Sequence, residues 1–204
     1  MALSAWHGRS TRTSITTLIT TLVVSVGVTP AVSAQSSSDT LTATASRQHT
    51  AADIAFMQGM IGHHAQALEM VALVASRSTR LEMESLAERI AVSQRDEISI
   101  MQRWLTARGE ATSMPHDMHS SHASMPGMLS PAQMDSLRTA DGTAFDKLFL
   151  QYMIQHHEGA LVMVAELLRS PGAAQEPMVF QIMSDVDADQ RAEIRRMKML
   201  LAQW

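Results

Sequence analysis

The sequence predicts an all-α protein, a four-helix bundle made of two repeated helical hairpins. The first observation is that apolar residues recur every three to four positions along four long segments, as on one face of a helix. The second is that capping residues, glycine or proline bound these segments. The third is that the pattern of the first half recurs in the second half. Two similar hairpins that each expose an apolar face bury it best against each other.

The first 34 residues have the features of a secretory signal peptide. Arg9 and Arg12 supply positive charge, residues 15–28 are apolar, and small residues end at Ala34. We therefore predict cleavage after Ala34, a periplasmic or secreted location, and no membrane contact after cleavage. An uncleaved membrane anchor is the alternative. The Ser/Thr-rich residues 35–49 then form a flexible leader.

The first predicted hairpin spans residues 50–109. Its boundaries are marked by capping or helix-ending residues: Thr50 with Asp53 at the start, Ser78 or Thr79 between the two helices, and Gly109 at the end. A threonine followed three residues later by a carboxylate can satisfy the free amides of a helix start. Glycine ends helices because it adopts positive φ without steric cost.

The second predicted hairpin, with a short helix before it, spans residues 130–204. Ser130, Pro131 and Gln133 predict the start of the short helix, because they provide a cap, a first-turn proline and a capping-box glutamine. The remaining boundaries are expected at glycine, capping and proline residues: Gly142 ending the short helix, Thr143 with Asp146 starting the third long helix, Ser170-Pro171-Gly172 ending it, and Gln175 near the start of the fourth.

The repeated positions include histidines, methionines, glutamines and glutamates. The first and third long helices share a histidine pair with flanking methionines: Met60, His63, His64 and Met70 recur as Met153, His156, His157 and Met163. The second and fourth share five positions, at which Gln94, Arg95, Glu97, Ile98 and Met101 recur as Gln190, Arg191, Glu193, Ile194 and Met197. The hairpin unit is therefore predicted to occur twice.

Both histidines of each pair are predicted to lie within a broad apolar face, since residues three and four apart share a face. Buried imidazoles and carboxylates need partners, and Glu97 and Glu193 lie in mostly apolar registers. These groups are expected to satisfy one another, with or without a metal. Neutral imidazole with thioether suits a soft cation such as copper. The candidate metal ligands of the bundle therefore include Glu97, Met101, Glu193 and Met197 besides the histidine pairs and their flanking methionines. The alternative is a hydrogen-bonded layer in a metal-free helical interaction module.

Residues 110–129 form a Met/His-rich loop without apolar periodicity. Its candidate ligands are four methionines and three histidines: Met114, His116, Met118, His119, His122, Met125 and Met128. Methionine in such a tether has no core to fill, so its thioether is available to a soft metal. We expect the loop to capture Cu(I) and pass it to the bundle. A low-complexity linker is the alternative.

Composition argues against several other functions. The chain contains no cysteine, which excludes thiolate metal sites, and its net charge of −4 with no basic stripe gives no support for nucleic-acid binding. No nucleophile–base–acid arrangement indicates catalysis. The enzymatic alternative is a di-iron or di-manganese oxidase, which needs Glu-x-x-His on two helices. That motif does not occur in register, and the candidate ligands are poor in the oxygen that hard metals prefer.

The pattern Asp…Phe…Met-Ile-x-His-His-x-x-Ala-Leu-x-Met resembles the bacterial family labelled "domain of unknown function 305", with its CopM-like periplasmic copper-binding proteins, over roughly residues 50–204. The resemblance implies a ferritin-like four-helix fold and, for some members, copper binding and resistance. By position, it implies these ligands: Met60, His63, His64, Met70, Met153, His156, His157 and Met163. We expect copper, as Cu(I), in preference to zinc or iron, and a metal-donor or metal-acceptor protein as a partner.

Overall fold

The computed structural model describes residues 49–113 and 125–204, and all regular secondary structure in these ranges is helical. The six helices in order are α1 (Ala51–Ala72), α2 (Val74–Arg77), α3 (Leu81–Thr106), α4 (Pro131–Thr139), α5 (Gly142–Arg169) and α6 (Pro177–Leu201). The all-α prediction is therefore confirmed for the described residues. The predicted signal peptide, nearly all of the leader and the middle of the Met/His-rich loop lie outside them.

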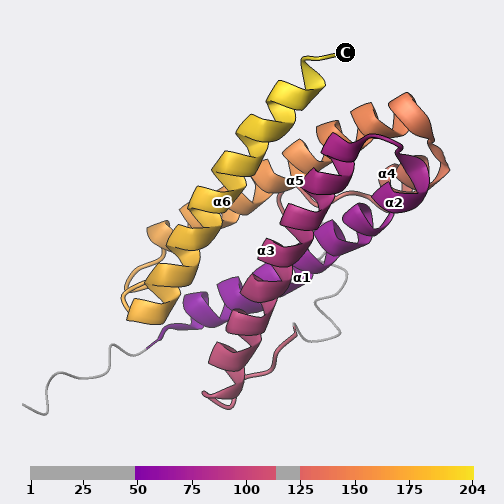
Figure 1. Cartoon of the computed structure of the whole chain (residues 1–204). Coiled ribbons are helices and arrows are strands. Elements are labelled where there is room, and N and C mark those ends of the chain that lie inside the picture. The colour runs from indigo at the N-terminus through magenta and orange to yellow at the C-terminus, as the bar shows by residue number, and fades with distance from the viewer. Residues whose placement is uncertain (1–48, 114–124) are drawn as a thin grey trace, which may run out of the picture. The chain divides into compact units, whose positions relative to one another are not determined.

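The four long helices pack in a closed order. Helix α1 packs along α3 and α5 along α6, while α1 also contacts α5 and α3 contacts α6 (Figure 1). The short helix α2 contacts α3 and α5, and α4 contacts α5. None of the helices in the described ranges has the length and apolar character needed to cross a membrane.

Two helices begin at the capping boxes that the sequence predicts. The Thr50 amide donates to Asp53 Oδ2 over 2.7 Å, and the Asp53 amide donates to Thr50 Oγ1 over 3.2 Å. Ser130 and Gln133 form the same reciprocal pair at the start of α4, at 2.9 and 3.3 Å. Asp53 also accepts a 2.8 Å hydrogen bond from the Ala174 amide at its other oxygen, which ties the start of α1 to the α5–α6 connection.

Two predicted helix starts are wrong. Helix α3 has Arg80 as its N-cap, and neither Ser78 nor Thr79 caps it. The Ser78 hydroxyl instead accepts a 3.2 Å hydrogen bond from the Arg80 amide, which lies before the first turn of the helix. Helix α5 begins at Gly142 itself, whose φ of +55° is tolerated because glycine has no Cβ. Thr143 therefore lies inside the first turn and does not form a capping pair with Asp146.

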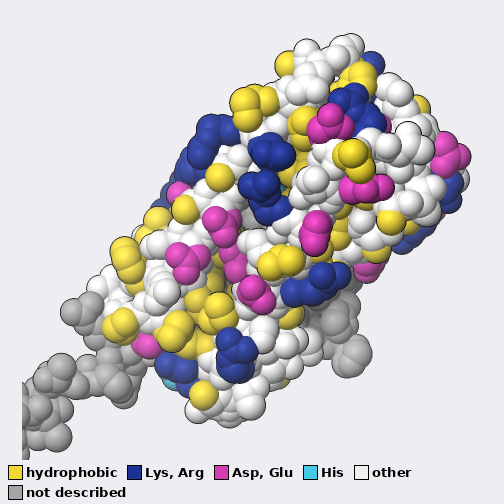
Figure 2. Space-filling model, in the orientation of Figure 1, with side chains coloured by type: hydrophobic (Ala, Val, Ile, Leu, Met, Phe, Trp, Pro, Cys, Tyr) yellow, Lys and Arg dark blue, Asp and Glu magenta, His cyan; other side chains and the backbone are white. Residues whose placement is uncertain are grey.

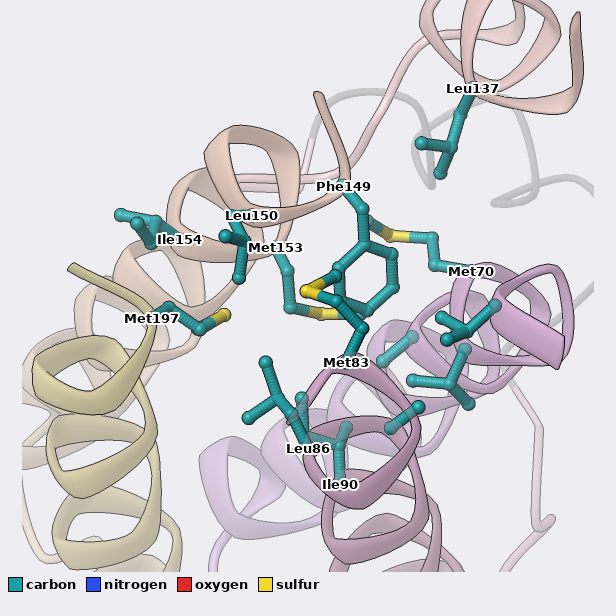
Figure 3. Close-up of a cluster of buried hydrophobic side chains, with 14 of the residues drawn as sticks. Met70, Met83, Leu86, Ile90, Leu137, Phe149, Leu150, Met153, Ile154 and Met197 are labelled. Carbon is teal, nitrogen blue, oxygen red and sulfur yellow. The ribbon is translucent and has the colours of Figure 1, made fainter. Parts of the chain in front are cut away.

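The core is divided into two hydrophobic clusters along the length of the helices. The Met153 cluster includes Met70, Met83, Phe149, Leu150, Met153 and Met197 (Figure 3). The Met60 cluster includes Phe56, Met57, Met60, Met101, Met163 and Met183. Each long helix contributes one stretch to each cluster, and a short stretch of buried polar residues separates the two.

Candidate metal centre

A layer of buried polar side chains lies between the two hydrophobic clusters. Each long helix contributes two of its members, and the polar layer consists of His63 and His64 from α1, Gln94 and Glu97 from α3, His156 and His157 from α5, and Gln190 and Glu193 from α6. The four histidines are fully buried, each at 0% exposure. Their position on the inner faces agrees with the helical spacing in the sequence.

Each hairpin contains one histidine–glutamate pair. His64 Nε2 lies 2.5 Å from Glu97 Oε2 across α1 and α3, and His157 Nε2 lies 2.6 Å from Glu193 Oε2 across α5 and α6. A carboxylate accepts, so each Nε2–H donates. A neutral imidazole in this tautomer has its lone pair on Nδ1. Neither Nδ1 has a hydrogen-bond partner among the described residues.

The other two histidines meet at the α1–α5 contact. The rings of His63 and His156 have centroids 3.8 Å apart and planes tilted by 36°. His63 Nε2 donates to the Pro126 carbonyl over 3.1 Å, which leaves its Nδ1 unpartnered. Neither ring nitrogen of His156 has a hydrogen-bond partner in the part of the chain that the structure describes. His156 is therefore the least satisfied imidazole of the layer.

Burial keeps the stacked pair uncharged. It lowers the pKa of His63 from 6.5 to about 3, with a further lowering by the neighbouring His64 and an opposing effect of the Pro126 carbonyl. Burial also lowers the pKa of His156 well below its usual value; the His63 ring adds to this effect and the His63 backbone opposes it. Both rings are thus neutral at physiological pH, which is the protonation state that a metal ligand requires.

Two glutamines in the polar layer have no side-chain hydrogen-bond partner in the described part of the chain. Gln94 and Gln190 are 0% and 1% exposed, and neither the amide nitrogen nor the oxygen of either side chain has a partner among the described residues. Leaving one buried polar group unpaired costs about 1–3 kcal/mol. Buried polar atoms are normally paired, so these atoms are open to a ligand or to water. In the sequence, the signal for these glutamines is the Gln-x-x-Glu spacing that α3 and α6 share.

The end of the Met/His-rich loop covers one side of the polar layer. The Pro126–Gly127 segment packs on α5 so closely that a Cβ added at Gly159 would lie 2.0 Å from the Pro126 oxygen and 2.5 Å from Gly127 Cα. Gln66 binds the Leu129 backbone at both amide and carbonyl, at 2.8 and 3.0 Å. The final residues of the loop are thus fixed against α1 and α5, so the tether expected across residues 110–129 does not extend to this end.

The predicted methionine ligands divide between the two sides of the polar layer. Met60, Met101 and Met163 belong to the Met60 cluster, and Met70, Met153 and Met197 belong to the Met153 cluster. Met60 and Met153 lie one helical turn before His63 and His156. Met125 packs against the Met60 cluster and Met128 is half-buried. The remaining loop candidates lie outside the described residues: Met114, His116, Met118, His119 and His122.

The described residues contain no group of three or more histidine, aspartate or glutamate side chains arranged to hold a metal ion. Any metal in the polar layer would need thioether or carboxamide ligands to complete its coordination. The available donors are imidazole nitrogens, of which those of His63 and His156 are neutral, with Met60 and Met153 one helical turn away. Such donors suit a soft cation better than a hard one. The residues present therefore fit copper, particularly Cu(I), better than iron or manganese.

A family model described as "Domain of unknown function (DUF305)" matches residues 53–201. The chain belongs to this family. The resemblance stated from the histidine-pair motif is thereby confirmed. None of the curated proteins matches the chain.

Solved structures of DUF305 proteins have the same fold. A fragment from Deinococcus radiodurans is 33% identical with a TM-score of 0.68, covering 76% of this chain and 99% of that one. A protein from Streptomyces coelicolor, named as a candidate secreted DUF305 protein, is 30% identical with a TM-score of 0.67, covering 74% and 93%.

CopM is a further structural neighbour, and its structures carry metals. Its Cu(I)-bound form is 27% identical to this DUF305 chain with a TM-score of 0.59, covering 77% of this chain and 99% of CopM. Similar matches are found for CopM in Cu(II)-bound, silver-bound and apo forms. The bound copper and silver are those of the CopM structures.

Proposed function

We propose that this protein is an exported copper-binding protein that sequesters or delivers Cu(I) in metal homeostasis and resistance, without catalysing a reaction. The single observation that carries the proposal is that the Nδ1 atoms of the four buried histidines in the polar layer have no hydrogen-bond partner among the described residues. Three of these rings are held in one tautomer by a partner at Nε2, in the way that outer partners orient metal-binding histidines. In addition, burial lowers the pKa values of His63 and His156, so both rings are neutral at physiological pH, as a metal ligand must be.

In this proposal His63, His64, His156 and His157 supply nitrogen, and methionines of the two flanking clusters supply sulfur. Glu97 and Glu193 act as positioning residues, because they hold His64 and His157 through Nε2 and leave Nδ1 free. The copper and silver forms of CopM support a soft cation. The loop from residue 110 to 129 is proposed to collect Cu(I), and a metal-donor or metal-acceptor protein is the expected partner.

The closed packing order of the four long helices supports a ferritin-like four-helix bundle, with the duplicated hairpin as its unit. We propose no oxidase chemistry of the di-iron type for this bundle. Both inner glutamates are engaged by histidine, and no oxygen-rich ligand group is present in residues 49–113 and 125–204. Export through a signal peptide cleaved after Ala34 is proposed from the order of charged, apolar and small residues.

Metal content tests the proposal directly. The full chain is expressed with its export segment in cells grown with added copper, zinc or iron, and the protein purified from the periplasm is assayed by elemental analysis. We expect copper to co-purify and the N-terminus to be Gln35. Protein free of copper under all three conditions would refute copper binding, and an intact N-terminus in the membrane fraction would refute cleavage.

Substitution identifies the ligands. Copper that binds only the folded state should raise the melting temperature. The double variant His63→Ala/His156→Ala should lose this increment, whereas His49→Ala, outside the polar layer, should keep it. A purely structural role of the two histidines predicts that the melting temperatures of metal-free and copper-loaded protein fall together, with the difference between them preserved.

A further inference from the structure

A groove runs between α3 and α6 on the side of the polar layer opposite the loop end. Its main cavity has a volume of about 620 Å³ and is lined by residues of both helices: Glu88, Arg89, Val92, Ser93, Asp96, Glu97, Asp185, Ala188 and Asp189. Acidic side chains dominate this lining, and Arg89 is its single basic residue. Figure 2, in which α3 and α6 face the viewer, shows acidic side chains along the line where these helices meet.

The groove reaches the polar layer at Glu97. Glu97 is 7% exposed, lines the groove and uses Oε2 for His64, while its Oε1 is buried without a hydrogen-bond partner among the described residues. A buried carboxylate oxygen without a donor is costly unless a cation or another polar group meets it. One turn away, Gln94 is fully buried with both polar atoms unpartnered. The groove thus ends near oxygen atoms of Glu97 and Gln94 that can coordinate a cation.

The acidic side chains that line the groove favour the binding of a cation there. Burial raises the pKa of Asp189, and the nearby Glu97 and Glu193 add to this effect, while the Ser93 hydroxyl, 3.3 Å from Asp189 Oδ2, opposes it. Carboxylates that repel one another in a partly enclosed groove are stabilised by a positive ion between them. The adjoining cavity at Glu193 is different, because Arg89 and Arg196 line it.

The opposite side of the polar layer offers less access. There Pro126 covers His63 through its hydrogen bond, and the Pro126–Gly127 backbone lies directly on Gly159. The polar layer is therefore covered at the α1–α5 contact and approached by an acidic groove at the α3–α6 contact.

We propose that the acidic part of the α3–α6 groove is the passage by which a hydrated metal cation reaches the polar layer, with Asp96 and Asp189 attracting the ion and Glu97 receiving it. This inference rests on the proposed copper function and names the route to that site. Two consequences follow. The rate of association should depend on the groove charges and on ionic strength, because a charged cleft raises the encounter rate of counter-ions. The ligands themselves should be unaffected by changes at the groove mouth.

Stopped-flow mixing of the full mature chain with silver nitrate measures the association rate, with ultraviolet absorbance as the signal. Asp96→Asn/Asp189→Asn should associate about tenfold more slowly than wild type and lose most of the salt dependence. Glu84→Gln, which removes an exposed carboxylate of α3 that does not line the groove, is the matched control and should change neither. Final silver stoichiometry should be equal in all three proteins.

A second pair of variants tests the passage by obstruction. Ala188→Arg places a long cation in the groove, whereas Gln102→Arg adds the same charge on an exposed position of α3 outside its lining. We expect slower association only for Ala188→Arg. Equal rates for Asp96→Asn/Asp189→Asn, Ala188→Arg and wild type, with silver bound normally, would overturn the passage while leaving the copper function intact. Absence of silver binding in wild type would instead refute the function on which the passage rests.

A readout independent of tight binding completes the test. Substoichiometric Mn²⁺ added to ¹⁵N-labelled protein broadens amide signals near any site where the ion dwells. We expect the strongest broadening at Asp96, Ala188 and Asp189, and its loss in Asp96→Asn/Asp189→Asn. Broadening spread evenly over acidic surface residues would contradict a groove that concentrates cations.

Discussion

Acid should destabilise the metal-free protein through the stacked histidine pair. In the unfolded chain His63 and His156 titrate near pH 6.5. In the folded protein burial lowers the pKa of His63 to about 3 and that of His156 well below 6.5. Below pH 6.5 the unfolded state therefore binds protons that the folded state does not, so stability is complete above the unfolded pKa and is lost as the pH falls toward the folded value.

The magnitude follows from the slope of this linkage. Each such histidine lowers the free energy of unfolding by about 1.4 kcal/mol for every pH unit below the unfolded pKa. For the two together, the free energy of unfolding should fall by about 3 kcal/mol between roughly pH 7.5 and 5.5. Urea denaturation with a chelator present, followed by circular dichroism, measures this difference. His63→Leu/His156→Leu should remove most of it, and a wild-type change below about 1 kcal/mol would show that the rings are protonated in the folded state.

Three further predictions concern individual residues. His156→Leu should raise the urea midpoint of the metal-free protein, because it replaces two buried nitrogens that have no partner among the described residues by an apolar side chain. The same variant should weaken copper binding in a chelator competition assay. A lower urea midpoint would contradict the first expectation. Gly159→Ala should cost about 1–3 kcal/mol in the same denaturation assay, since its Cβ would collide with the Pro126 backbone, whereas Ala at exposed Gly109 meets no atom and costs only backbone strain. Deleting residues 114–124 should preserve the melting temperature, while deleting 114–128 should lower it, because it removes the Pro126 carbonyl that His63 binds and the segment that holds Leu129 on Gln66; equal melting temperatures would show that the loop end contributes nothing.

Much of the fold could be predicted because its determinants are local or repeated. Thr50 with Asp53 and Ser130 with Gln133 form capping boxes through residues three apart, which the sequence displays directly. The inward position of His63 and His64 follows from helical periodicity alone. The missed starts of α3 and α5 arose where several residues compete to cap one helix, and small differences in turn geometry select among them.

The finer geometry of the candidate site could not be predicted, because it depends on contacts between distant segments. Nothing in the local sequence around Pro126 shows that its carbonyl meets His63, since that contact needs the close approach that Gly159 permits. The unpartnered atoms of Gln94 likewise emerge only when four helices surround it. Spacing could place these residues on inner faces but could not tell whether the groups satisfied one another.

The loop end gives two similar hairpins different roles. Gln66 in α1 and Gly159 in α5 occupy corresponding positions of the repeat, three residues after the first histidine of each pair. Gln66 holds the Leu129 backbone, while Gly159 makes room for Pro126 and Gly127, so one segment is fixed by both halves at once. Among the residues that the structure describes, His63 thus gains a carbonyl partner and His156 gains none. The loop that joins the hairpins therefore breaks the symmetry of the polar layer, and it leaves His156 as the imidazole with most to gain from a metal.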